Sequence, residues 1–118
     1  MTNQPPTQSI DINPAPQTAD EYLQRAWLHL ANKEIDLAET DFTQSLQLNG
    51  QLADAFYGLG LVQRERSEYE KAIRSFQEAL ALIQMDALID SPQRGTILRN
   101  LCKSQIMMAT EAAKKAAP

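Results

Sequence analysis

Few side chains in this sequence have types and spacings that could carry out chemistry. His29 is the only histidine, and it lies a helix apart in the sequence from any pair of carboxylates that would orient it as a general base. Cys102 is the only cysteine, and its alignment with helix-packing positions predicts a small buried residue rather than a reactive thiol. No metal-ligand spacing or nucleophile motif appears in the sequence. We therefore expect no catalysis, no metal and no cofactor.

The run Gly58-Leu59-Gly60 has no strand before it that would make it a phosphate-binding loop, and it belongs to an internal repeat instead. Shifting the sequence by 34 residues superposes Ala38 on Ala72 and Phe42 on Phe76. Such a period is typical of helix-turn-helix repeats. The small residues let two helix backbones approach closely, and the aromatic residues fill the groove that results. The sequence therefore predicts stacked pairs of helices.

The run from Phe56 to Leu82, FYGLGLVQRERSEYEKAIRSFQEALAL, resembles the tetratricopeptide repeat family. It is similar to the family's pattern of a bulky residue, Leu-Gly, a spacer, then Tyr-x-x-Ala and Phe-x-x-Ala-Leu. The earlier copy departs from this pattern, because Arg25 stands where the family has leucine and His29 where it has tyrosine. The resemblance implies an all-α fold, a right-handed α-solenoid of two helix-turn-helix repeats with a C-terminal capping helix.

The chain is expected to divide near Thr18 into a tail and a repeat domain. Residues 1–17 hold four of the six prolines and a single charged residue, which predicts a disordered, proline-rich N-terminal tail. The alternative is that Pro14-Ala15-Pro16 lies back into the protein's own groove. The repeat domain is expected over residues 18–115, with repeats at about 19–52 and 53–86 and a further helix at about 92–114.

Local signals predict where the helices begin and end. Thr18 and Glu21 form a capping box at the start of the first helix, and Ser67 with Glu70 is expected to do so at the start of the fourth. Gly50 is expected to end the second helix in the left-handed conformation. The expected helices cover about 18–31, 34–48 and 52–66, and the fourth runs from 67 onward.

The 34-residue period fails after Leu82. Either the fourth helix is prolonged or a short loop covers residues 84–90, before Ser91 and Pro92 start a fifth helix that extends to about Lys114. An additional shift of eight residues restores the pattern by aligning Leu98, Leu101 and Cys102 with Phe56, Leu59 and Gly60.

This fifth helix is expected to cover the open edge of the second repeat. Helical spacing predicts that its apolar face contains Ile97, Leu98, Leu101, Cys102, Met108 and Ala109.

Composition excludes several classes of function. A net charge of −4 argues against nucleic-acid binding, which needs a basic face. No stretch is long and apolar enough to insert into a membrane, and the N-terminal residues do not have the pattern of a secretory signal. The single cysteine excludes an internal disulfide and favours a reducing, cytoplasmic location.

The resemblance implies that the first helix of each pair lines a concave groove that binds a partner. The family positions that contact ligands are apolar near the amino-terminal end of this groove and cationic near the other. We therefore predict a peptide or helix with an apolar side chain and an acidic group. The alternative is that Leu23 and Trp27 are core residues and that the cations are only solvated. The predicted groove residues are Leu23, Trp27, Leu30, Tyr57, Leu61, Arg64, Arg99 and Lys103.

The family subtype that clamps a terminal carboxylate is not expected, because Leu23, Trp27 and Gly58 stand where its lysines and asparagines would be. The leading interpretation is a non-catalytic protein–protein interaction module, an adaptor or scaffold of co-chaperone-like type. The alternative is a structural subunit that self-associates into a homo-oligomer or larger assembly through the Met107–Met108 region or the Trp27 end.

Overall fold

The computed structural model describes residues 15–85 and 92–116, and within them the chain is an all-α helical repeat solenoid. The predictions for residues 1–14 and for Ser91 lie outside the described residues. In chain order the elements are α1 (Ala19–Ala31), α2 (Ile35–Leu48), α3 (Ala53–Glu65), α4 (Tyr69–Met85) and α5 (Pro92–Ala116).

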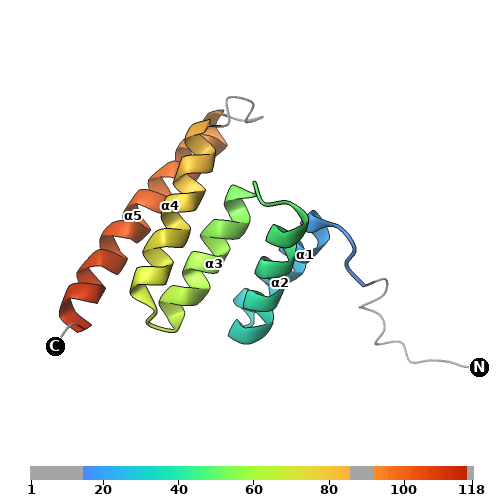
Figure 1. The fold of residues 1–118 in the computed structure, drawn as a ribbon, viewed down its shortest axis with the longest axis horizontal. Coiled ribbons are helices and arrows are strands. Elements are labelled where there is room, and N and C mark those ends of the chain that lie inside the picture. The colour runs from blue at the N-terminus through green and yellow to red at the C-terminus, as the bar shows by residue number, and fades with distance from the viewer. Residues whose placement is uncertain (1–14, 86–91, 117–118) are drawn as a thin grey trace, which may run out of the picture.

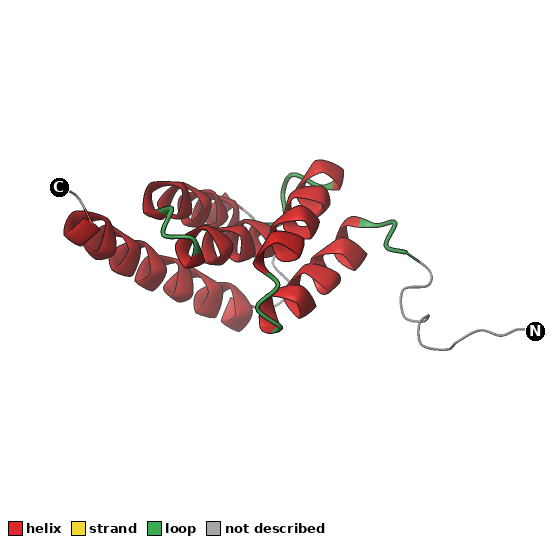
Figure 2. Cartoon of the chain, turned by 90° about the horizontal axis from the view of Figure 1, so that it is seen from below, coloured by secondary structure: helices red, strands yellow, loops and turns green. Residues whose placement is uncertain are grey.

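The helices follow one another across the molecule in chain order, with α5 at the edge opposite α1 and α2 (Figure 1). The pairs α1–α2 and α3–α4 are the hairpins that the repeat predicts, α2 packs against α3, and α5 packs against α4. Figure 2 shows the long helix that leads to the C-terminus lying along one side of the stack. α4 is prolonged past Leu82 to Met85, which is one of the two arrangements expected for this region.

The capping box at the start of α1 is confirmed. The Thr18 Oγ1 atom accepts a hydrogen bond from the Glu21 backbone N–H at 3.1 Å, and the Glu21 carboxylate accepts one from the Thr18 N–H at 3.3 Å. The same carboxylate accepts the Gln17 N–H at 2.8 Å. These bonds satisfy donors that have no partner inside the helix, and they define where the repeat domain begins.

The turn inside each hairpin contains one residue with a left-handed backbone, Lys33 (φ 65°) in the first and Ser67 (φ 62°) in the second. The Lys33 N–H donates to the Leu30 carbonyl at 3.0 Å, and the next N–H, of Glu34, donates to the His29 carbonyl at 2.8 Å. Ser67 and its successor make the equivalent pair of bonds to Arg64 and Gln63. This is the Schellman arrangement, in which the left-handed residue ends the first helix.

Two predictions about helix ends are therefore wrong. Ser67 does not start α4, because its left-handed backbone ends α3 and α4 begins only at Tyr69. Gly50 does not adopt a left-handed conformation, since no glycine among the described residues has a positive φ. α2 ends instead at Asn49, whose backbone is extended and whose side chain accepts the Gln51 N–H at 3.0 Å.

Replacing Lys33 with glycine is expected to raise the free energy of unfolding by about 0.5–1 kcal/mol, because glycine adopts a positive φ without steric cost. The gain should appear as a higher urea midpoint with an unchanged slope. Asn32→Gly, one residue earlier, is the matched control, because Asn32 already has a negative φ of −92°. Equal effects of the two substitutions would contradict the strain at Lys33.

Two aromatic rings fill the spaces where α3 packs closely against its neighbours. Phe42 and Phe76 are fully buried. A Cβ atom added at Gly58 would lie 2.2 Å from the Phe42 ring, and one added at Gly60 would lie 2.5 Å from the Phe76 ring. The two glycines therefore create the space for the rings, Gly58 against the preceding α2 and Gly60 against the following α4.

The apolar face predicted for α5 is only partly correct. Cys102 and Ala109 are buried, but Ile97 (59% exposed), Leu101 (42%) and Met108 (50%) are largely in solvent. The cause is that α4 is the one described helix that packs extensively on α5, so α5 buries only one side. Cys102 packs in a cluster with Ala79 and Ile83 of the preceding α4.

Cys102 therefore does not match Gly60, which faces the following helix α4, because Cys102 packs on the preceding helix instead. The predicted alignment of the fifth helix with the third is wrong at this position. Leu101 and Met108 lie about 100° and 120° around the helix from Cys102, so they point away from α4.

Candidate partner-binding groove

A row of four aromatic rings links the helices α1, α2, α3 and α4, each of which contributes one ring. The Trp27 ring meets the Phe42 ring edge-on at a centroid distance of 5.0 Å and lies 6.5 Å from the Tyr57 ring. The Tyr57 ring in turn lies 5.5 Å from the Phe76 ring. The two phenylalanines are fully buried, whereas Trp27 and Tyr57 are half-buried. The row therefore connects the core with an accessible face of the molecule.

The other predicted apolar residues lie at different depths. Leu23 is only 9% exposed and belongs to the core cluster of the first repeat, so most of its surface is already covered by its own chain. Trp27 and Leu30 pack on the same cluster but remain partly accessible. Leu61 is also half-buried. The accessible apolar part of the predicted site is therefore Trp27, Leu30, Tyr57 and Leu61.

Arg64 is held at the junction between α3 and α5. Its Nη1 atom donates a hydrogen bond to the Gln105 Oε1 atom at 2.6 Å. Burial raises the pKa of the Tyr57 hydroxyl, and a hydrogen bond with the same Gln105 acts in the opposite direction. At the other end of the two helices, Arg94 pairs with Asp54 at 2.5 Å. Sequence reasoning missed Gln105, because its role depends on the register of α5.

The structure does not bring Arg99 and Lys103 beside Arg64. Gln105 bonds to Arg64 and therefore marks the side of α5 that faces α3. Helical geometry puts Arg99 about 120° and Lys103 about 160° around the helix from Gln105, past the side that packs on α4. The predicted cationic end of the groove therefore contains Arg64 alone of these three. Leu101 and Met108 lie about 40° and 60° from Gln105 in the other direction around the helix, and both are exposed.

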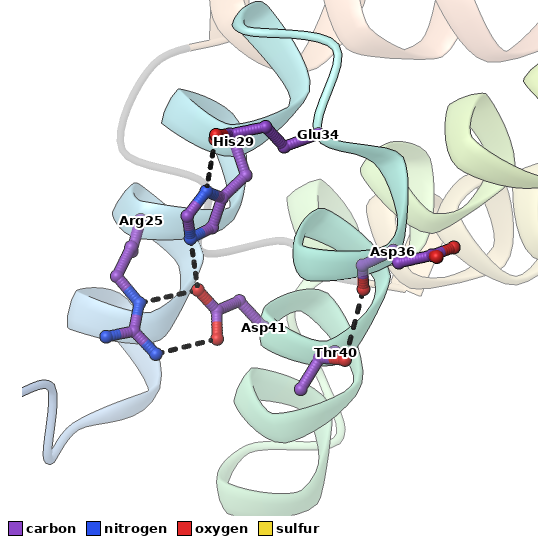
Figure 3. A network of polar contacts seen from close by, with 6 residues as sticks. All are labelled: Arg25, His29, Glu34, Asp36, Thr40 and Asp41. Atoms are coloured by element: carbon purple, nitrogen blue, oxygen red, sulfur yellow. Dashed lines mark hydrogen bonds and ion pairs between the residues drawn. The ribbon is translucent and has the colours of Figure 1, made fainter.

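A second cluster of polar residues joins α1 to α2 (Figure 3). Arg25 binds the carboxylate of Asp41 through two hydrogen bonds of 2.7 and 3.0 Å. The His29 Nδ1 atom lies 2.8 Å from the Glu34 carboxylate, and its Nε2 atom lies 3.6 Å from that of Asp41. The expectation that no carboxylates orient His29 is therefore wrong.

The role of this cluster is structural. Asp41 is 2% exposed, and its hydrogen bond to Arg25 is the main cause of the raised pKa of that guanidinium. In the second repeat, Leu59, Gln63 and Ser75 stand 34 positions after Arg25, His29 and Asp41, and the Ser75 hydroxyl donates to the Gln63 side chain at 2.6 Å. Both repeats thus use the same positions to connect their two helices, and the first does so with charges.

Cys102 is buried, and burial raises the pKa of its thiol to about 11. A thiol of this kind is almost entirely protonated at neutral pH and is a poor nucleophile. Within residues 15–85 and 92–116, no three His, Cys, Asp or Glu side chains gather where they could hold a metal ion. Among the described helices, none has the length and hydropathy that a membrane span requires.

Comparison with known proteins supports the repeat interpretation. Residues 53–85 match the family model described as Tetratricopeptide repeat. No curated protein matches the chain. A solved structure, described as the crystal structure of MamA protein, is similar with a TM-score of 0.55 and 25% sequence identity. The match covers 83% of this chain and 56% of MamA, so the chain spans little more than half the length of that protein.

The matched segment contains the glycines of α3 and the buried Phe76 of α4. It therefore covers the α3–α4 hairpin, and α1–α2 repeats this arrangement with charged residues at the helix contact. The packing, the matched repeat at residues 53–85 and the likeness to MamA together support a tetratricopeptide repeat protein.

Proposed function

We propose that this chain is a non-catalytic adaptor or scaffold that binds a partner peptide or helix along the inner face of α1 and α3. Tetratricopeptide repeats are protein–protein interaction modules in general. The observation that carries the proposal is the half-buried pair Trp27 and Tyr57. The Trp27 ring packs against the buried Phe42 ring, and the Tyr57 ring packs against the buried Phe76 ring. Rigid aromatic side chains of this kind are common anchors of binding energy.

The expected partner combines an apolar side chain with an acidic group. The apolar side chain would lie on Trp27, Tyr57 and Leu61, which are half-buried. The acidic group would pair with Arg64, whose guanidinium has further donors besides the one that binds Gln105. The single cysteine is consistent with a cytoplasmic location, which belongs to the same proposal.

The test compares two charge reversals in affinity capture from native cell extract. A bait with Arg64→Glu is expected to lose the partner with a 10- to 100-fold weaker affinity, about 1.4–2.7 kcal/mol, because an acidic group would then meet a like charge. A bait with Arg99→Glu carries the same change in net charge on the far side of α5 and should retain the partner. Thermal unfolding of each bait checks that the fold survives.

The outcome that contradicts the proposal is equal retention by the wild-type and Arg64→Glu baits. Loss of the partner with Arg99→Glu but not with Arg64→Glu would mean that the acidic group binds near Arg99, as the sequence predicts, and not at Arg64. Loss of the partner with Leu61→Ala as well would support the apolar contact, since Leu61 is half-buried and adjoins the aromatic pair.

The second candidate function is that of a structural subunit that self-associates. The observation in its favour is the number of exposed apolar side chains on α5, which are Ile97, Leu101, Met107 and Met108. A single small protein rarely leaves so many large apolar residues together in solvent without a binding role.

A further inference from the structure

The turn between the two repeats contains an asparagine that is directly followed by a glycine, Asn49-Gly50. Both residues are exposed, as is Gln51 after them. The fold does not require a glycine here, because the φ of Gly50 is not positive and an added Cβ would make only an ordinary contact, 3.7 Å from the Leu46 carbonyl oxygen. The missing side chain instead leaves the backbone nitrogen of residue 50 unshielded next to the Asn49 amide.

The backbone N–H of Gly50 makes no hydrogen bond with any residue that the structure describes. The other described asparagines differ in this respect. After Asn32, the Lys33 N–H donates to a carbonyl of α1 at 3.0 Å, and Asn100 lies inside α5, where the next N–H belongs to the helix. Among the asparagines in the described ranges, Asn49 alone is therefore followed by a nitrogen that is exposed, unbonded and unhindered.

We infer that Asn49 is a site of spontaneous deamidation through a cyclic imide. The Gly50 nitrogen loses its proton to water or hydroxide and attacks the Asn49 Cγ atom. A new C–N bond forms, and the side-chain nitrogen takes up a proton and leaves as ammonia. Water then opens the imide ring. Cleavage of the bond to Cγ gives aspartate, and cleavage of the bond to the main-chain carbonyl carbon gives isoaspartate.

The observed turn must change before the attack, and the glycine allows the change. Asn49 has a ψ of 99°, which turns the Gly50 nitrogen away from the Asn49 side chain, and the side-chain oxygen accepts the Gln51 N–H at 3.0 Å. A flip of the peptide plane between Asn49 and Gly50 brings the nitrogen to Cγ and changes the φ of Gly50 by the opposite amount. Glycine adopts positive and negative φ alike, so the flip costs little more than one exposed hydrogen bond.

Both products change the junction between the repeats. Each puts a carboxylate where the amide stood, which makes the net charge of −4 more negative by one. Isoaspartate also routes the main chain through Cβ and so lengthens the link between α2 and α3. Because ammonia is lost, the change accumulates with the age of the protein.

The test follows the full chain by peptide mass spectrometry during incubation at physiological temperature and pH. Tryptic digestion gives residues 34–64, in which Asn49 is the one asparagine, and residues 26–33, which contain Asn32. Asn49 is expected to convert at least about tenfold faster than Asn32 and to give both aspartate and isoaspartate. Gly50→Ala should slow the conversion at least about tenfold, because its Cβ hinders the nitrogen and disfavours the flip.

Gly50→Ala separates the chemistry from folding, since the added Cβ has room and should not lower the urea midpoint. Conversion of Asn49 no faster than that of Asn32 would overturn the inference. An equal rate in Gly50→Ala would do the same, as would aspartate as the sole product, because direct hydrolysis of the amide gives aspartate alone. Partner binding in the groove enters none of these measurements.

Discussion

Replacing Phe42 with alanine is expected to lower the free energy of unfolding by about 3–5 kcal/mol. The ring is fully buried, lies directly above Gly58 of α3 and meets Trp27 edge-on at 5.0 Å. Its removal leaves a cavity that cannot be filled by small shifts, because the glycine opposite has no side chain. A domain of this size is typically stable by only about 5–15 kcal/mol, so much of the population should unfold on mild heating.

Urea unfolding monitored by circular dichroism measures this loss. The matched control is Leu28→Ala on α1, because Leu28 is 65% exposed and its truncation should change the stability by less than about 0.5 kcal/mol. A similar midpoint for Phe42→Ala and the control would mean that the ring does not fill the contact between α2 and α3. Trp27 fluorescence should also shift in Phe42→Ala, since the indole loses its neighbour.

Replacing Arg25 with leucine, the residue that stands 34 positions later, is expected to cost about 2–4 kcal/mol. The Arg25 side chain is 40% exposed, so its own removal costs little. The cost arises because Asp41 loses its ion-pair partner. Asp41 is 2% exposed, and without Arg25 the polar partner left to its carboxylate among the described residues would be His29, at 3.6 Å. A buried carboxylate without its partner is costly.

Transplanting the whole arrangement of the second repeat should reverse this loss. The triple variant Arg25→Leu/His29→Gln/Asp41→Ser replaces the charged cluster by the uncharged pair that Gln63 and Ser75 form at 2.6 Å. Its free energy of unfolding should return to within about 1 kcal/mol of the wild type. If the triple variant is no more stable than Arg25→Leu, the two repeats do not use these positions equivalently.

The sequence by itself determined the number, type and order of the helices. A 34-residue period of small and aromatic residues is a local property, and it correctly predicted the two hairpins, the buried Phe42 and Phe76 and the capping box at Thr18. For these features, the residues that interact are separated by fixed distances in the chain. That Trp27 and Tyr57 line a partner-binding groove stays a prediction from the family resemblance.

Where a prediction depended on how one helix packs against another, the tertiary structure decided. The exposure of Leu101 and Met108 follows from the side of α5 that packs on α4, and the separation of Lys103 from Arg64 follows from the position of Gln105. The period could not predict which side of α5 is buried, because it fails before α5 begins and no later helix covers this one in the described chain.

The polar contacts between helices were equally beyond the sequence. Arg25 donates hydrogen bonds to Asp41, which is sixteen residues later, and Arg64 donates one to Gln105, which is forty-one residues later. The residue types are common and surface-like, so composition alone suggests solvated charges. Only when helix packing buries Asp41 does the cost of an unpaired carboxylate make its contacts with Arg25 and His29 a requirement of the fold.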